Sequence, residues 1–268
     1  MILERLLAAK REQLAREALA VPECTLFAAA ERKRENGRQS GTFREAILRE
    51  GLSIIAEVKR ASPSAGAIAP GMDAAAQAEK YAGGGADAIS VLTESAFFQG
   101  SADDLETIRV RIPQQPLLRK DFILSERQIA ESFLLGADAI LLIVAILDAG
   151  ALRRLVALAG YYGMACLVEA HTADELDTAL NMDPEGRSIV LGINHRNLDN
   201  GRVDISRFEP LRSLVPAGHS VVAESGVRTP EDARRLRLSG ADAILVGEAL
   251  MRSPNPAALL RAMKETSP

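Results

Sequence analysis

Cysteine is scarce in this chain, and so is histidine. The 268 residues include two cysteines, Cys24 and Cys166, and neither belongs to a metal-binding spacing. Two cysteines cannot build a disulfide framework in a chain of this length, which favours a reducing compartment, the cytoplasm. The three histidines, His171, His195 and His219, are scattered, so we predict no metal site. We expect His195 behind the site or at the surface, and His219 at the surface.

Long apolar runs and an excess of positive charge are absent as well. The longest candidate run, AILLIVAIL at 139–147, is about half of what a membrane span needs. The N-terminal MILERLLAAKREQLAREALA carries charges throughout, so it lacks the apolar centre of a signal peptide and indicates an amphipathic helix. Lysine and arginine number 32 against 36 acidic residues, so we expect neither nucleic acid nor a membrane as partner. Local groups must then bind any anionic ligand.

A five-residue repeat, GADAI, indicates how strands and helices follow one another in the chain. It begins at Gly85, Gly136 and Gly240, each time after a helix-like stretch and before an apolar, strand-like run. The copies lie 51 and 104 residues apart, close to a ratio of one to two. If 51 residues hold two strand–helix units, one unit takes about 26 residues, a usual length in parallel folds.

Further strands are predicted where this period requires them. They lie at 53–58, 116–122, 164–171, 188–196 and 220–226, which makes eight strands alternating with helices. Eight such units predict an α/β protein, a (β/α)8 TIM barrel over 51–268. Residues 1–50 form an N-terminal helical extension packed on the barrel, with one or two helices and a solvated turn at 31–38. An open doubly wound sheet is the alternative, but no GxGxxG turn follows any strand.

Polar side chains close five of the predicted strands. Along each strand they share a face with an apolar or small residue two positions earlier. Any single one could reach water or cap the next helix, but charges gathered and buried at one barrel mouth cost stability unless they have a task. The pattern predicts an active site at the carboxyl ends of the strands. The residues are Glu57, Lys59, Lys120, Glu169, Asn194, Arg196, Glu224 and Ser225.

Two glycines after the last two strands indicate a phosphate site. Gly226 in ESGV and Gly247 in VGEA stand at strand-to-helix turns, where backbone N–H groups are free. The loops after these strands form the usual phosphate site of a TIM barrel. We therefore predict a small phosphorylated ligand.

Resemblance to a known family rests on seven motifs in order: IIAEVKRASPS, SVLTESAFFQGS, LLRKDFI, LVEAH, GINHRNL, VAESGV and ILVGEALM. They resemble indole-3-glycerol phosphate synthase of tryptophan biosynthesis over nearly the whole chain. The resemblance implies a lyase that converts 1-(2-carboxyphenylamino)-1-deoxyribulose 5-phosphate to indole-3-glycerol phosphate, CO₂ and water, with no metal and no cofactor. Two positions depart from it: Ala65, where the family often has Lys, and His195, where it often has Asn.

The resemblance also implies residue roles. The catalytic positions it implies are Glu57, Lys59, Lys120, Glu169, Asn194, Glu224 and Ser225. The phosphate contacts are Ser62, Gly226, Gly247 and the backbone of Glu248, with Arg196 close by, and the aromatic-ring pocket is Phe97, Phe122, Leu142 and Leu198.

The chemistry that the resemblance implies fits the residue types. Lys120 is the expected acid for the oxygen that becomes negative at ring closure, and burial beside Lys59 should lower its pKa. Lys59 would hold the substrate carboxylate, oriented by Glu57, and Glu169 would act as base or acid. Asn194 and Glu224 would bind the substrate hydroxyls and the amine. Which of Lys59, Lys120 and Glu169 protonates the departing hydroxyl stays open.

Two other functions are weighed against this one. A phosphoribosylanthranilate isomerase-like enzyme would use a Cys or Asp base at a strand end, whereas the parity of its strand turns Cys166 outward. A non-catalytic phosphosugar-binding barrel has no reason to keep a buried acid and base together. A monomer is one option for the oligomeric state, which the sequence leaves open.

Overall fold

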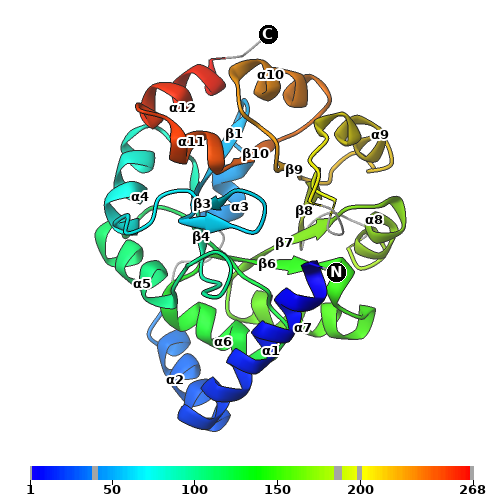
Figure 1. The fold of residues 1–268 in the computed structure, drawn as a ribbon. Coiled ribbons are helices and arrows are strands. Elements are labelled where there is room, and N and C mark those ends of the chain that lie inside the picture. Colours follow the sequence, from blue (N-terminus) through cyan, green and yellow to red (C-terminus); the bar gives the residue numbers. More distant parts are fainter. Residues whose placement is uncertain (1, 38–41, 184–188, 198–200, 266–268) are drawn as a thin grey trace.

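Eight parallel strands form a closed barrel in a computed structural model of the protein, which describes residues 2–37, 42–183, 189–197 and 201–265 (Figure 1). Each strand pairs with its neighbours in chain order, and the first pairs with the last to close the ring. The predicted (β/α)8 barrel is confirmed. The strands are β1 (Ser53–Val58), β4 (Ala88–Leu92), β5 (Leu117–Lys120), β6 (Ala139–Ile143), β7 (Ala165–Ala170), β8 (Ile189–Asn194), β9 (Val221–Glu224) and β10 (Ala243–Val246).

Helices connect the strands and surround the barrel (Figure 1), as parallel strands require. Many begin at a side chain that accepts a backbone N–H, such as Asp148 or Thr229. A short hairpin, β2 (Ala61–Ser62) with β3 (Gly66–Ala67), follows β1. The helices are α4 (Ala74–Gly83), α5 (Ala102–Arg111), α6 (Glu126–Leu135), η1 (Val144–Ile146), α7 (Ala149–Tyr161), α8 (Ala173–Leu180), η2 (Ile205–Arg207), α9 (Phe208–Arg212), α10 (Pro230–Leu238), α11 (Glu248–Arg252) and α12 (Pro256–Lys264).

Strand residues alternate between two apolar layers. Leu118, Leu167 and Val222 belong to the cluster inside the barrel, whereas Ile140 and Val168 belong to the cluster between barrel and helices. This alternation follows from the period of two along a strand. Polar residues placed two positions after an inward apolar residue therefore lie above the inner layer, at the mouth.

The GADAI repeat ties neighbouring strands together. Each first glycine has φ between 92° and 94°, a left-handed conformation that favours glycine. The aspartates Asp87, Asp138 and Asp242 each accept a backbone N–H from a preceding strand, at 2.7, 2.8 and 2.8 Å. The same aspartates also donate their backbone N–H to that strand. The repeat is thus a clamp between neighbouring strands, at the barrel end opposite the site.

The N-terminal extension contains three helices, α1 (Ile2–Ala20), α2 (Glu23–Glu35) and α3 (Thr42–Ile47). The expected solvated turn at 31–38 is wrong for its first five residues, which complete α2. The charged side chains there make defined contacts: Lys33 donates to the Leu134 carbonyl and Arg34 stacks on Tyr161. Within the described ranges, no helix has both the length and the apolar character to cross a bilayer.

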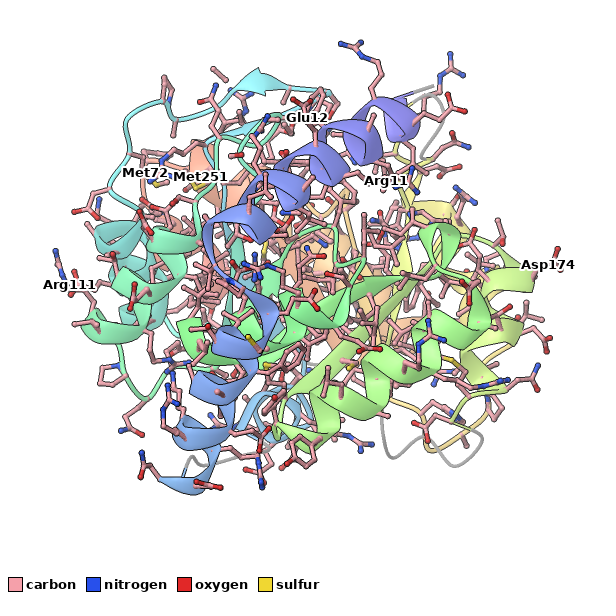
Figure 2. All side chains as sticks on the ribbon, turned by 90° about the horizontal axis from the view of Figure 1, so that it is seen from below. Arg11, Glu12, Met72, Arg111, Asp174 and Met251 are labelled. Atoms are coloured by element: carbon pink, nitrogen blue, oxygen red, sulfur yellow. The ribbon has the colours of Figure 1, made fainter. Side chains whose placement is uncertain are left out.

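Helix α1 runs across the barrel, with Arg11 and Glu12 on it (Figures 1 and 2). Its attachment is a fully buried ion pair between Lys10 and Asp121, 2.9 Å apart. Asp121 directly follows Lys120 and also accepts hydrogen bonds from Thr93 and Arg119. The extension is therefore bonded to the residue next to a predicted catalytic lysine.

Candidate active site

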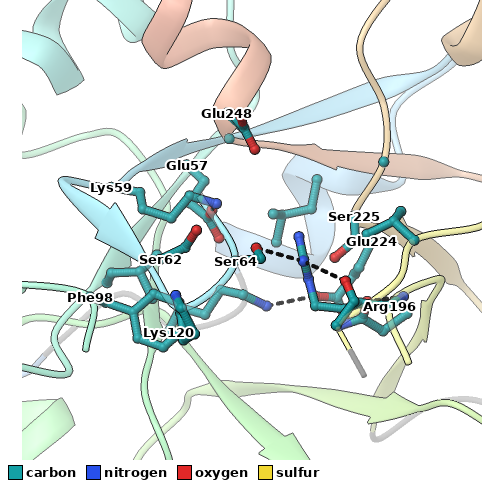
Figure 3. A pocket seen from close by; sticks show the side chains of 18 of the residues that line it. Glu57, Lys59, Ser62, Ser64, Phe98, Lys120, Arg196, Glu224, Ser225 and Glu248 are labelled. Carbon is teal, nitrogen blue, oxygen red and sulfur yellow. Dashed lines mark hydrogen bonds and ion pairs between the residues drawn. The ribbon is translucent and has the colours of Figure 1, made fainter. Parts of the chain in front are cut away.

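A cavity of about 520 Å³ opens at the carboxyl ends of the strands (Figure 3). Its size suits a small-molecule ligand. Leu3 and Leu6 of α1 line it from outside the barrel, and Leu141 and Ile143 line it from β6. Most residues that the sequence predicts for the site line this cavity: Glu57, Lys59, Ser62, Lys120, Phe122, Glu169, Asn194, Arg196, Glu224, Ser225, Gly226, Gly247 and Glu248.

The predicted aromatic-ring pocket needs correction. Leu142 is fully buried between barrel and helices, because Leu141 and Ile143 are the β6 residues that face inward. Phe98, not Phe97, lines the cavity. Glu94 explains the second difference: its buried carboxylate accepts three backbone N–H groups at 96–98 and shapes the loop that presents Phe98. Leu198 lies outside the described residues.

Lys120 lies between two carboxylates at the centre of the mouth. Its Nζ is 2.7 Å from Oε2 of Glu224 and 3.5 Å from Oε2 of Glu169, and Figure 3 shows it reaching towards Glu224. Burial acts to lower the pKa of Lys120, but Glu224 and Glu169 outweigh burial and raise this pKa above its ordinary value. The expected lowering is therefore wrong: Lys59 pairs with Glu57 instead, so its charge is balanced locally.

Glu57 and Lys59 form a second ion pair, with 2.6 Å between Nζ and Oε1. Both line the same cavity, and Glu57 is buried. This geometry agrees with the expectation that Glu57 orients Lys59. Gly247 makes room for the pair, since a Cβ there would lie 2.3 Å from Oε1 of Glu57. In the same way, a Cβ on Gly192 would lie 2.2 Å from Oε1 of Glu224.

Burial and neighbouring charges shift the pKa values of the two carboxyls beside Lys120 in opposite directions. Burial raises the pKa of Glu224, and Glu169 raises it further, although Lys120 acts in the opposite direction. Burial also acts to raise the pKa of Glu169, but Lys120 and His171 outweigh it and the pKa is lowered. A site with one protonated and one ionised carboxyl can supply an acid and a base together.

The turns after β8 and β9 form the polar rim of the cavity. Ser225 and Gly226 both have left-handed backbone, with φ of 69° and 85°. Arg196 donates from Nη1 to Oγ of Ser64 at 2.9 Å, which joins this rim to the β2–β3 loop (Figure 3). Ser62 is buried and accepts the backbone N–H of Ala65 at 3.1 Å. These backbone and side-chain donors can bind an anion such as a phosphate.

All three histidines are buried. The expected surface position is therefore wrong for His219, and of the two positions expected for His195 the one at the surface is wrong. A backbone carbonyl faces two of the rings: that of Ser225 lies 2.7 Å from Nδ1 of His195, and that of Asp183 lies 3.0 Å from Nε2 of His219. His171 contacts Glu169, and sequence reasoning missed it. The signal was present, because His171 follows Glu169 by two residues in LVEAH.

The described residues include no group of three or more His, Cys, Asp or Glu side chains that could hold a metal ion. The cavity is lined by ammonium, carboxyl and amide groups over an apolar wall. They can bind an anionic aromatic molecule, donate a proton and accept one.

Fold and site together are those of a (β/α)8 barrel whose cavity brings buried ammonium and carboxyl groups together beside groups that can bind an anion. Comparison with known proteins identifies the family. A model of the family described as indole-3-glycerol phosphate synthase matches residues 3–263. The chain belongs to this family of carboxy-lyases of tryptophan biosynthesis.

Individual relatives agree with the family. The chain is 42% identical over 262 residues to indole-3-glycerol phosphate synthase of Aromatoleum aromaticum, covering 98% of each chain. It is 48% identical over 205 residues to the Chlorobium limicola protein of the same name, covering 76% of this chain and 78% of that one.

Solved structures show the same fold at low identity. The 3-hexulose-6-phosphate synthase of Salmonella typhimurium superposes with a TM-score of 0.64 at 16% identity, over 80% of this chain and 98% of that one. The 3-keto-L-gulonate-6-phosphate decarboxylase of Vibrio cholerae superposes with a TM-score of 0.63 at 17% identity, over 81% and 97%.

Proposed function

We propose that this protein converts 1-(2-carboxyphenylamino)-1-deoxyribulose 5-phosphate to indole-3-glycerol phosphate, CO₂ and water through the residues of this cavity. The observation that carries the proposal is the buried Lys120 between Glu169 and Glu224 at the barrel mouth. Membership of the family sets the reaction, and the geometry supports the roles given to individual residues.

Binding uses the two sides of the cavity. The phosphate lies against the rim at Gly226, Gly247 and Arg196, where backbone N–H groups and a guanidinium are available. The aromatic ring lies against Phe98 and Phe122, beside the apolar β6 wall. Lys59 holds the ring carboxylate until it leaves as CO₂.

Ring closure begins when the ring carbon that bears the carboxylate attacks the ketone carbon. The carbonyl electron pair moves to oxygen, and Lys120 stabilises that charge and transfers its Nζ proton to the oxygen. A raised pKa does not prevent this step, since an alkoxide is far more basic than an amine. Loss of CO₂ then returns the electrons of the broken carbon–carbon bond to the ring.

Dehydration needs one acid and one base. The hydroxyl leaves as water with a proton from the protonated carboxyl of the Glu169 and Glu224 pair, which by pKa is Glu224. Glu169 removes a proton from the neighbouring carbon, and the electrons of that C–H bond complete the indole double bond. Asn194, which lines the cavity next to Glu169, is available for the substrate hydroxyls.

The isomerase alternative gains no support from Cys166. That thiol is buried in the outer layer, and burial raises its pKa to about 12, so it is neither accessible nor ionised at neutral pH. The purified protein should be assayed with the carboxyphenylamino substrate and with phosphoribosylanthranilate, both in the presence of EDTA. Appearance of indole fluorescence with the first substrate alone supports the proposal. Binding of the first substrate without turnover would favour a phosphosugar-binding barrel.

We further propose that the protein acts as a monomer in the cytoplasm. The residues proposed for the reaction, Lys120, Glu169 and Glu224, come from three strands of the same barrel, and both cysteines are free thiols. Light scattering at working concentration tests the oligomeric state.

A further inference from the structure

A histidine that the proposed mechanism does not use lies behind Glu169. His171 directly follows β7, and its side chain is 5% exposed. Its Nε2 lies 3.3 Å from Oε1 of Glu169, and its Nδ1 lies 3.2 Å from Oε2 of Glu175. The imidazole therefore bridges a carboxylate that lines the cavity and one on α8 that does not line it.

The first turn of α8 holds this ring in place. Oε2 of Glu175 also accepts the backbone N–H of His171 at 2.7 Å, and Thr172 caps the helix by accepting the backbone N–H of Glu175. From η2, Arg207 donates to the His171 carbonyl at 2.7 Å. Both sides of the residue are thus bonded, which leaves Nε2 directed at Glu169.

The contact between His171 and Glu169 is an ion pair without a hydrogen bond. Nε2 is buried and lies 3.3 Å from Oε1 of Glu169, but it makes no hydrogen bond with the residues that the structure describes. A buried nitrogen without a partner is costly. A small rotation of the Glu169 carboxylate would complete the bond, as often happens when an active site binds its substrate.

Charges around the ring favour the imidazolium. The carboxylates of Glu169 and Glu175 face it directly and Glu224 acts from β9, whereas Arg207 is the nearby cation from η2 and Lys120 lies beyond Glu169. Burial acts to lower the pKa of His171, but a hydrogen bond with Glu175 and the charge of Glu169 outweigh it and raise this pKa.

We propose that His171 is a positioning residue for the reaction: held by Glu175, its imidazolium orients the Glu169 carboxylate and keeps it ionised as the base. The inference rests on the proposed function, in which Glu169 removes a proton during dehydration. Lys120 alone does not suffice, since it also pairs with Glu224 and gives up its proton in the preceding ring closure.

His171→Gln tests the charge, because glutamine retains an N–H donor and cannot become a cation. We expect the acidic limb of the kcat profile to move to higher pH by about one unit, since loss of a nearby cation raises the pKa of a carboxyl. At the optimum kcat should fall about three- to tenfold, while KM stays within about twofold because His171 does not line the cavity. Glu175→Gln should shift the limb in the same direction by less.

The matched control is Asp174→Asn, which removes one negative charge from the same helix turn. Asp174 is exposed and points away from the barrel (Figure 2). We expect its profile to equal that of the wild type. Thermal unfolding of each variant separates a shifted limb from a damaged fold. If His171→Gln fails to fold, the pH profile of kcat for Glu175→Gln tests the proposal instead.

A second measurement does not depend on turnover. The chain has three histidines, so their ring resonances can be titrated by NMR in the wild type and in Glu175→Gln. We expect His171 to titrate above the ordinary histidine range in the wild type and lower in the variant. An ordinary titration in both proteins, or unmoved acidic limbs in two folded and active variants, would overturn the proposal. A wild type inactive towards the carboxyphenylamino substrate would instead refute the proposed function.

Discussion

Single residues at the mouth act through their neighbours' charges. The negative charge shared by Glu224 and Glu169 raises the pKa of Lys120, so in the proposed mechanism this lysine meets the substrate with its proton in place. The charge that grows on the carbonyl oxygen during ring closure is what such a cation stabilises. Its contribution therefore belongs to the transition state more than to substrate binding.

Replacement of this lysine provides the test at the residue scale. We expect Lys120→Ala to lower kcat by at least about a thousandfold, while affinity for substrate or product stays within about tenfold. Lys120→Arg, which keeps a cation but holds its proton too tightly to transfer it, should recover binding without recovering kcat. Single-turnover kinetics and calorimetric binding measure the two quantities. Lost binding together with normal turnover of bound substrate would contradict the role.

At the scale of elements, α1 is joined to the site by the Lys10–Asp121 pair. Removal of one partner from a buried ion pair leaves an uncompensated charge. Lys10→Met should therefore lower the free energy of unfolding by about 3 kcal/mol and reduce kcat/KM, since Leu3 and Leu6 of the same helix line the cavity.

Urea unfolding and steady-state kinetics measure both effects of Lys10→Met. The control is Arg5→Met, which makes the same charge change at an exposed position of α1. If Lys10→Met behaved like Arg5→Met in both measurements, α1 would not depend on this pair.

For the molecule as a whole, the buried carboxyl pair makes the free energy of unfolding depend on pH. Burial and Glu169 raise the pKa of Glu224 to about 8 in the folded protein, from 4.5 in the unfolded chain. The folded state thus binds this proton more tightly. Its stabilising contribution is complete below pH 4.5 and is lost as the pH rises towards 8.

Glu224→Gln removes this titration. Relative to the wild type, its free energy of unfolding should increase by about 1 kcal/mol or more between pH 5 and pH 8. Urea unfolding at both pH values measures the change, with the exposed Glu231→Gln as control. A difference between wild type and variant that stays constant with pH would show that Glu224 ionises normally in the folded protein.

Much of the architecture could be predicted because it follows from local rules. Alternation along β5, β7 and β9 placed Lys120, Glu169 and Glu224 above the inner apolar layer, and the GADAI period located all eight strands. The same rule, applied strictly, assigns Leu142 to the outer layer, because Leu141 and Ile143 take the inward positions. The ring-pocket role that the resemblance implied for Leu142 therefore does not fit the alternation along β6.

The barrel, the end at which the site lies and the residue types that gather there could thus be predicted from local patterns, since strand period, helix caps and turn glycines act over a few residues. The pKa shifts could not be predicted in this way, because they depend on the folded arrangement. The pKa of Lys120 depends on Glu224, which is 104 positions away in the chain yet 2.7 Å away in space. The seating of α1 on Asp121 and the approach of His171 to Glu169 are settled in the same way, because Coulomb interactions and burial depend on distance in the folded molecule.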